Sequence, residues 1–173
     1  MGSRNDRYEP LPRKDTPCVE APELDQEPDE GGGTVDGECV LVPEGEYELR
    51  YVDYETATYY GAAKVIVHYA IVRPDEYAGL PVDRFYNASR LTGPPGRFGK
   101  YVAPRRGALV REFKKLVGHA ERLDRLRFAQ LKGQRVVGEI QTVKTDHKHE
   151  ELPEDDRYSR IKRLLRVLPG DDW

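Results

Sequence analysis

The sequence is poor in several residue types that build reactive or redox sites. Its 173 residues include two cysteines, one methionine, one tryptophan and four histidines. Cys18 and Cys39 have no CxxC spacing, which favours two inert thiols over a disulfide or a metal site. No stretch approaches the ~20 apolar residues of a membrane helix, and the N-terminus lacks an apolar signal segment. We therefore expect a soluble, cytoplasmic protein without a membrane partner.

The motifs of common catalytic and cofactor sites are also absent. The chain contains no P-loop, GxSxG, HExxH or GxGxxG pattern. Its acidic residues are plentiful, but none lies in the apolar setting that would raise a carboxyl pKa for acid–base work. His147 and His149 neighbour Asp146, Glu150 and Glu151 at a spacing that matches no metal motif. We expect no enzyme activity, no metal and no cofactor.

Charge is sorted along the chain, although the net charge is only −3. Residues 1–40 carry four basic and eleven acidic side chains, whereas residues 80–148 carry sixteen basic and six acidic ones. A block with a net charge of +10 indicates a polyanionic partner. The acidic segments on either side of this block are either solvating tails or competitors for its basic surface.

The first 43 residues are predicted to form a disordered acidic arm. They contain six prolines and the run Gly31-Gly32-Gly33, and their one aromatic residue is Tyr8. Such a segment cannot bury enough apolar surface to offset the entropy lost on ordering. About 130 residues remain, which is enough for one modest core. We expect the folded domain over residues 44–168.

Hydrophobic periodicity predicts five strands and a helical region. Strands are expected over residues 46–54, 63–72, 81–88, 134–145 and 158–168, the last with a helix as the alternative. Residues 55–60 predict a turn, and the prolines and glycines of 91–104 predict a loop. Apolar residues at helical spacing over 109–117 predict a helix, followed by a second short helix over 123–131. Gly138 predicts a bulge or tight bend.

Five short strands with a helix between the third and fourth have the connectivity of the OB-fold, a small Greek-key barrel. This order favours a mainly β fold over a βαβ fold, in which strand and helix alternate throughout. From residue 44 onward the chain resembles the OB-fold single-stranded-DNA-binding proteins of phages, plasmids and other mobile elements. The resemblance rests on element order, on the strand around 65–69, on residues 79–87 (GLPVDRFYN) and on the ending Asp171-Asp172-Trp173. It implies nucleic-acid binding without catalysis.

The basic block interleaves aromatic side chains with cations. Single-strand binders need this combination, because cations follow the phosphates while rings stack on the bases. In the OB-fold the ligand crosses strands two and three between two loops, here 55–61 and 145–156. The candidate contacts are Tyr59, Tyr60, Lys64, Arg84, Tyr86, Arg97, Phe98, Lys100, Tyr101, Arg105, Arg106, Lys144 and Lys148. Among the aromatic residues, the loop residues Phe98 and Tyr101 favour a ligand role, whereas the strand residues Tyr47, Tyr51, Tyr69 and Phe85 favour the core.

Two features have alternative interpretations. The helical region carries cations that form either a solvated face or a surface close to phosphates: Arg105, Arg106, Arg111, Lys114, Lys115, Arg122, Arg125 and Arg127. The ending Asp171-Asp172-Trp173 is either an ordinary chain end or, as the resemblance implies, a tip that recruits replication or recombination proteins. In such a tip the aromatic ring fills a pocket and the carboxylates meet a basic rim.

The sequence therefore predicts non-sequence-specific binding of single-stranded DNA in replication, recombination or transfer of a phage or mobile element. RNA is the alternative ligand, and a homo-oligomer is an alternative to a monomer. The alternative function is a protein-interaction or regulatory β-barrel module whose acidic arm mimics or masks nucleic acid.

Overall fold

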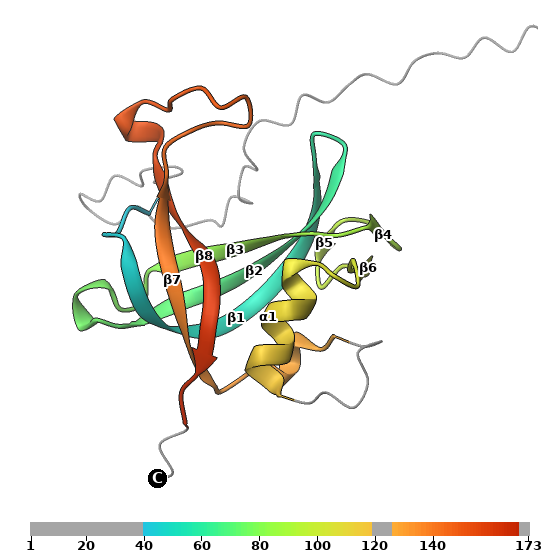
Figure 1. Ribbon diagram of the computed structural model, residues 1–173, viewed down its shortest axis with the longest axis horizontal. Helices are drawn as coiled ribbons and strands as arrows, with labels where there is room; N and C mark the ends of the chain where they lie inside the picture. Colours follow the sequence, from blue (N-terminus) through green and yellow to red (C-terminus); the bar gives the residue numbers. More distant parts are fainter. Residues whose placement is uncertain (1–39, 119–125, 170–173) are drawn as a thin grey trace, which may run out of the picture. The chain divides into compact units, whose positions relative to one another are not determined.

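A computed structural model describes residues 40–118 and 126–169 of the chain (Figure 1). It is mainly β, with five long strands and one α-helix. The long strands are β1 (Gly45–Tyr59), β2 (Ala62–Arg73), β3 (Pro81–Asn87), β7 (Arg135–Val143) and β8 (Tyr158–Val167), and the helix is α1 (Ala108–Val117). Short elements are β4 (Arg90–Leu91), β5 (Gly96–Arg97), β6 (Tyr101–Val102) and the 3₁₀ turns η1 (Asp75–Tyr77), η2 (Phe128–Leu131) and η3 (Glu154–Asp156).

The long strands form one antiparallel sheet in the order β3-β2-β1-β7-β8. β5 adds to the free edge of β1, and β4 pairs with β6 as a separate ribbon. The outermost strands β3 and β8 contact each other, but within the described ranges no hydrogen-bonded ladder joins them. The predicted mainly β fold, with a helix between its third and fourth long strands, is confirmed. The barrel is not closed.

The core lies on the face of the sheet that strand alternation predicts. Side chains two residues apart point to the same face, so the apolar alternation of β1 and β2 buries one face of both strands. Tyr47, Tyr51 and Tyr69 are buried there as predicted, while Phe85 is half-buried. α1 packs Leu109, Phe113 and Leu116 onto the same cluster, which also includes Val65, Val67, Ile140, Ile161 and Leu164.

Gly138 lies at an irregularity in β7, as predicted. The register between β7 and β8 shifts between Val137 and Gly138. A Cβ atom at Gly138 would lie 2.6 Å from Leu49 Cδ1 and 3.2 Å from Leu164 Cδ2. The absence of a side chain therefore lets β7 approach two fully buried leucines.

The turn predicted over residues 55–60 is wrong, because β1 continues through Tyr59. Thr56 is buried opposite Val65, so this half of the strand contributes to the sheet like the first half. The turn is confined to Tyr60 and Gly61, whose φ angles of 51° and 77° are the positive values that a two-residue hairpin of type I′ requires. Residues 158–167 form a strand, so the helix alternative is excluded there.

The described fold begins before residue 44. Val42 is buried, its backbone N–H donates to Ser159 Oγ at 2.8 Å, and the Ser159 N–H donates to the Val40 carbonyl at 2.9 Å. Residues 40–43, predicted as the end of the arm, are thus bound to the start of β8. Residues 1–39, the second predicted helix up to residue 125 and the tip residues Asp171, Asp172 and Trp173 lie outside the described residues.

Candidate nucleic-acid interface

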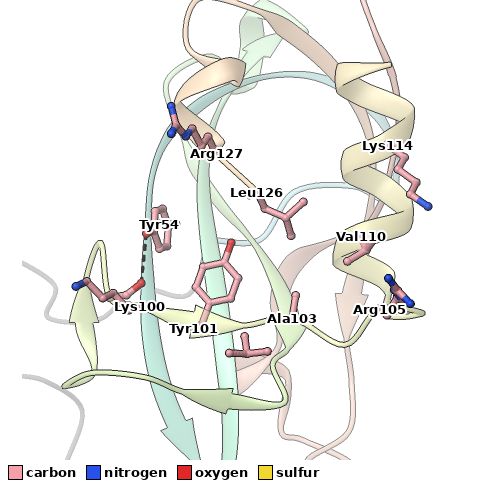
Figure 2. A pocket seen from close by; sticks show the side chains of 11 residues that line it. Tyr54, Lys100, Tyr101, Ala103, Arg105, Val110, Lys114, Leu126 and Arg127 are labelled. Atoms are coloured by element: carbon pink, nitrogen blue, oxygen red, sulfur yellow. Dashed lines mark hydrogen bonds between the residues drawn. The ribbon is translucent and has the colours of Figure 1, made fainter. Parts of the chain in front are cut away.

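A groove of about 1240 Å³ lies between α1 and the chain segment that precedes it (Figure 2). Three parts of the chain form it: the middle of β1, residues 99–105, and α1 together with residues 126–127. The lining residues are Tyr54, Gly99, Lys100, Tyr101, Val102, Ala103, Arg105, Val110, Lys114, Leu126 and Arg127. The groove therefore brings together Lys100, Tyr101 and Arg105, which were among the candidate contacts.

Among the described residues, four cations line the groove and no carboxylate does. Lys100, Arg105, Lys114 and Arg127 are all exposed. Across the part of the chain that the structure describes, none of the four forms an ion pair. Like charges gathered without counterions produce a positive potential that attracts anions.

The wall of the groove is aromatic. The Tyr54 and Tyr101 rings meet edge to face, with centroids 5.9 Å apart, and Tyr54 Oη donates to the Gly99 carbonyl at 3.2 Å. Tyr101 Oη is buried without a hydrogen-bond partner in the described structure, and burial raises the pKa of this hydroxyl. Tyr101 is thus held as a neutral ring whose edge packs against Tyr54.

Phe98 adds an exposed ring next to Tyr54. Its backbone N–H donates to the Tyr54 carbonyl at 3.0 Å, and the two ring centroids are 5.6 Å apart. Phe98 has a φ of 56° and remains 51% exposed. The Arg97 guanidinium lies 4.9 Å from the Phe98 ring and pairs with Asp53 at 2.9 Å. A cation and an exposed ring therefore lie together at this position.

The single carboxylate of α1 points inward. Glu112 is buried and accepts hydrogen bonds from Arg84, at 2.7 and 3.1 Å, and from Tyr86 Oη at 2.5 Å. Burial, followed by the Glu112 charge, raises the pKa of the Tyr86 hydroxyl, so Tyr86 remains a donor. The charged side chains that α1 exposes are therefore all cations: Arg111, Lys114 and Lys115.

Arg84 and Tyr86 do not belong to a nucleic-acid surface, contrary to the prediction. Tyr86 is 3% exposed, and the Arg84 side chain is 14% exposed and bound to Glu112. A ring without a free face cannot stack on a base, and a guanidinium already paired with a buried carboxylate does not face the phosphates. Both side chains instead join β3 to α1.

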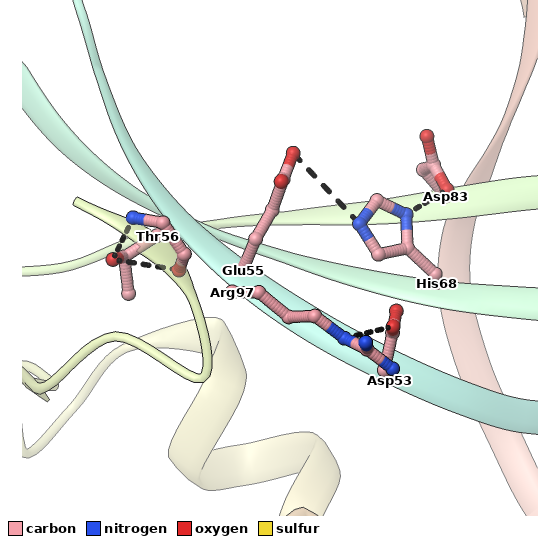
Figure 3. Close-up of polar contacts among 7 residues, drawn as sticks. Asp53, Glu55, Thr56, His68, Asp83 and Arg97 are labelled. Atoms are coloured by element: carbon pink, nitrogen blue, oxygen red, sulfur yellow. Dashed lines mark hydrogen bonds and ion pairs between the residues drawn. The ribbon is translucent and has the colours of Figure 1, made fainter. Parts of the chain in front are cut away.

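The solvent face of β1, β2 and β3 carries a carboxylate cluster (Figure 3). Asp83 Oδ1 lies 2.7 Å from His68 Nδ1, and Glu55 Oε1 lies 3.8 Å from His68 Nε2. The hydrogen bond that the His68 imidazole makes to the Asp83 carboxylate is the main cause that raises the pKa of His68. Lys64, predicted as a contact on this face, is bound to Asn87. These carboxylates make the face of strands two and three less suited to phosphates than the groove.

The two loops expected to flank a ligand meet each other. The rings of Tyr60 and His147 stack with centroids 4.0 Å apart and an interplanar angle of 22°. Tyr59 and Tyr60 are 45% and 81% exposed. The predicted contacts Arg106, Lys144 and Lys148 are also exposed. None of these residues lines the groove.

The candidate contacts predicted from the sequence did not include the groove residues Tyr54, Lys114 and Arg127. Tyr54 looked like the last residue of a strand, and Lys114 and Arg127 were among the helical cations with two interpretations. The spacing of Val110 and Lys114, one helical turn apart, places both on one face of α1. This spacing distinguishes Lys114, which lines the groove beside Val110, from its neighbour Lys115, which does not line it.

Comparisons with protein-family models, with curated proteins and with solved structures found no match. No helix among the described residues is long and apolar enough to cross a membrane. Within the same residues, no group of three or more histidine, cysteine or acidic side chains is arranged to hold a metal ion. The functional proposal therefore rests on the geometry of the groove.

Proposed function

We propose that this protein binds single-stranded nucleic acid, DNA in the first place, through the groove beside α1. The observation that carries the proposal is a set of four cations around an aromatic and apolar wall; in the described structure these cations form no ion pair and the wall contains no carboxylate. The binding is non-sequence-specific and serves replication, recombination or transfer of a phage or mobile element.

The chemistry of the groove matches the two parts of a nucleotide. Cations close to phosphates release condensed counterions, which contributes affinity independent of sequence. Aromatic and apolar surface accepts the faces of bases, at about 1–3 kcal/mol per stacked base. The exposed Phe98 ring, in contact with Tyr54, provides such a surface beside the cations.

The fold supports the same proposal. Five long strands with α1 between the third and fourth agree with an OB-fold architecture, which binds oligonucleotides in many proteins. The proposed site differs from the expected one, because it lies at α1 and residues 99–105. The outer face of β1 and β3 carries three carboxylates, those of Asp53, Glu55 and Asp83. They make that face less suited to phosphates and so favour the groove as the site.

The test compares two variants with equal charge changes. The groove variant replaces Lys100, Arg105, Lys114 and Arg127 by Ala, and the control variant replaces Arg90, Arg111, Lys115 and Lys132, which are exposed and do not line the groove. Binding of labelled oligo-dT is measured by fluorescence anisotropy over a salt series. We expect the logarithm of the wild-type binding constant to fall linearly with the logarithm of the salt concentration, and this salt slope should be about −0.7 per phosphate contact. The groove variant should lose most of the affinity.

Matched ligands complete the experiment. Oligo-dA and oligo-rU test base and sugar preference, and a duplex of the same length tests strand selectivity. Absence of oligo-dT binding at low salt would exclude the proposal and leave the protein-interaction module as the remaining candidate. Equal losses in the groove and control variants would show that net charge, and not the groove, governs binding.

A further inference from the structure

The four groove cations lie on two opposite sides, which we call rims. Lys100 and Arg127 lie beside Tyr54 and form the loop rim, whereas Arg105 and Lys114 lie on the side of α1 and form the helix rim (Figure 2). Tyr101, Ala103 and Leu126 lie between them. The groove is thus positive on both sides of an apolar and aromatic centre.

This two-sided arrangement restricts how a strand can bind. A strand that follows the length of a groove keeps its phosphates on one side and its bases on the other, so a single positive rim is sufficient. A ligand with one anionic end and an apolar body, such as a fatty acid, also needs only one rim. A ligand with phosphates on both sides of a base needs two.

We infer that a bound strand crosses the groove from rim to rim, with one nucleotide on the centre and its two phosphates on opposite rims. The inference rests on the proposed function and specifies its smallest ligand, a nucleoside 3′,5′-bisphosphate unit. Each rim carries two cations that can make charge-assisted contacts with phosphate, and the described lining residues include no carboxylate that would weaken such contacts.

Two thymidine nucleotides that carry two phosphates each test the crossing directly. Thymidine 3′,5′-bisphosphate carries its phosphates on both sides of the nucleoside, whereas thymidine 5′-diphosphate carries both on one side. Each competes with labelled oligo-dT for the wild-type protein. We expect the bisphosphate to displace the oligonucleotide at a concentration about tenfold lower than the diphosphate, since one charge-assisted contact accounts for roughly that factor. Equal displacement, or stronger displacement by the diphosphate, would overturn the inference.

Paired variants give a second measurement that uses only oligo-dT. Lys100→Ala with Arg127→Ala removes the loop rim, and Arg105→Ala with Lys114→Ala removes the helix rim. We expect both pairs to reduce the salt slope by similar amounts, about 0.7 for one lost phosphate contact. A salt slope that changes in only one of the two paired variants would overturn the crossing geometry. This measurement decides the question even if the bisphosphate and the diphosphate both bind too weakly to compare.

The outcomes separate this inference from the proposed function. Wild-type protein that fails to bind oligo-dT would refute both. Wild-type binding that depends on one rim alone would refute the crossing geometry and retain single-strand binding. Circular dichroism melting of each variant provides the folding control, and no change is expected because all four side chains are exposed.

Discussion

Arg84 and Glu112 form a two-point ion pair between β3 and α1. Arg84 Nη2 lies 2.7 Å from Glu112 Oε1, Arg84 Nε lies 3.1 Å from Glu112 Oε2, and the two side chains are 14% and 9% exposed. This pair connects the helix that carries Val110 and Lys114 to the sheet. It therefore holds one wall of the groove in position.

Replacing Glu112 by Ala should destabilise the domain by about 3–5 kcal/mol, because it leaves the Arg84 charge buried without a counterion. The double variant Arg84→Met with Glu112→Leu should lose clearly less, since it removes both charges and keeps apolar volume. Urea unfolding followed by circular dichroism measures both free energies. Equal losses in the single and the double variant would contradict the interpretation that an uncompensated charge is the cause.

Removal of the hydroxyl should lower the free energy of unfolding at one buried tyrosine and not at another. Tyr86 Oη donates to Glu112, so Tyr86→Phe should cost about 1.5–3 kcal/mol, as for a hydrogen bond to a charged group. Tyr69 Oη is buried without a partner in the described structure, so Tyr69→Phe should be neutral or stabilise by about 1 kcal/mol. Both free energies of unfolding come from the same urea titration. A loss in Tyr69→Phe as large as in Tyr86→Phe would refute this assignment of hydrogen bonds.

His68 should stabilise the fold at acidic pH and less at basic pH. Its hydrogen bond with Asp83 raises the pKa of the folded imidazole above the usual value of about 6.5. The folded state therefore binds the proton more tightly, and the contribution is complete below pH ~6.5 and disappears as pH rises through the folded pKa. The free-energy difference between wild type and His68→Asn should shrink from pH 5.5 to pH 8.5. In an Asp83→Asn background this pH dependence should disappear. A free-energy difference between wild type and His68→Asn that grows with pH would contradict the prediction.

Gly138→Ala should destabilise the domain by about 1–3 kcal/mol through overpacking. The added methyl group would enter the space of Leu49 and Leu164, which are 0% and 1% exposed and have little room to move. Gly93→Ala is the matched control, because its nearest neighbour would be Lys100 Cβ at the ordinary distance of 3.9 Å. Thermal melting of the two variants tests this, and equal melting temperatures would count against the close approach.

Phe98→Ala should weaken oligo-dT binding by about 1–3 kcal/mol and leave the salt slope unchanged, because a stacking surface is lost without a phosphate contact. Its exposed ring allows this change with little effect on folding. Tyr101→Ala is a poorer test, since the Tyr101 ring packs on the core cluster through Tyr54 and Phe128. Anisotropy at three salt concentrations distinguishes a parallel shift, which is expected, from a change of slope.

Most of the fold could be predicted from the sequence, because strand alternation is a local property. Val65, Val67 and Tyr69 point inward as their spacing predicts. The extension of β1 through Tyr59 was missed, although Thr56 and its neighbours have suitable β-propensity. Their pairing with β2 depends on a two-residue turn at Tyr60 and Gly61 that carries neither an Asn-Gly nor an Asp-Gly signal.

The site was less predictable, because it depends on contacts between distant residues. Arg84 and Tyr86 have the composition of a binding surface, but Glu112 lies 28 residues after Arg84 and accepts both of their hydrogen bonds. No local pattern indicates that pairing. The groove likewise requires Lys100, Lys114 and Arg127 to meet through the packing of α1 on the sheet. Of the four groove cations, only Lys100 and Arg105 were among the contacts predicted from the sequence.

Each rim is built from two separate parts of the chain, and this arrangement has a consequence for stability. The loop rim carries residues 100 and 127 and the helix rim carries residues 105 and 114, so a ligand held by both would act as a non-covalent cross-link between residues that lie 5 to 22 positions apart in the chain. By mass action, such a ligand at one hundred times its dissociation constant stabilises the folded state by about 2.7 kcal/mol. Amide hydrogens next to the groove would then exchange more slowly with solvent. Occupancy by a polynucleotide would thereby become one of the forces that keep this domain folded.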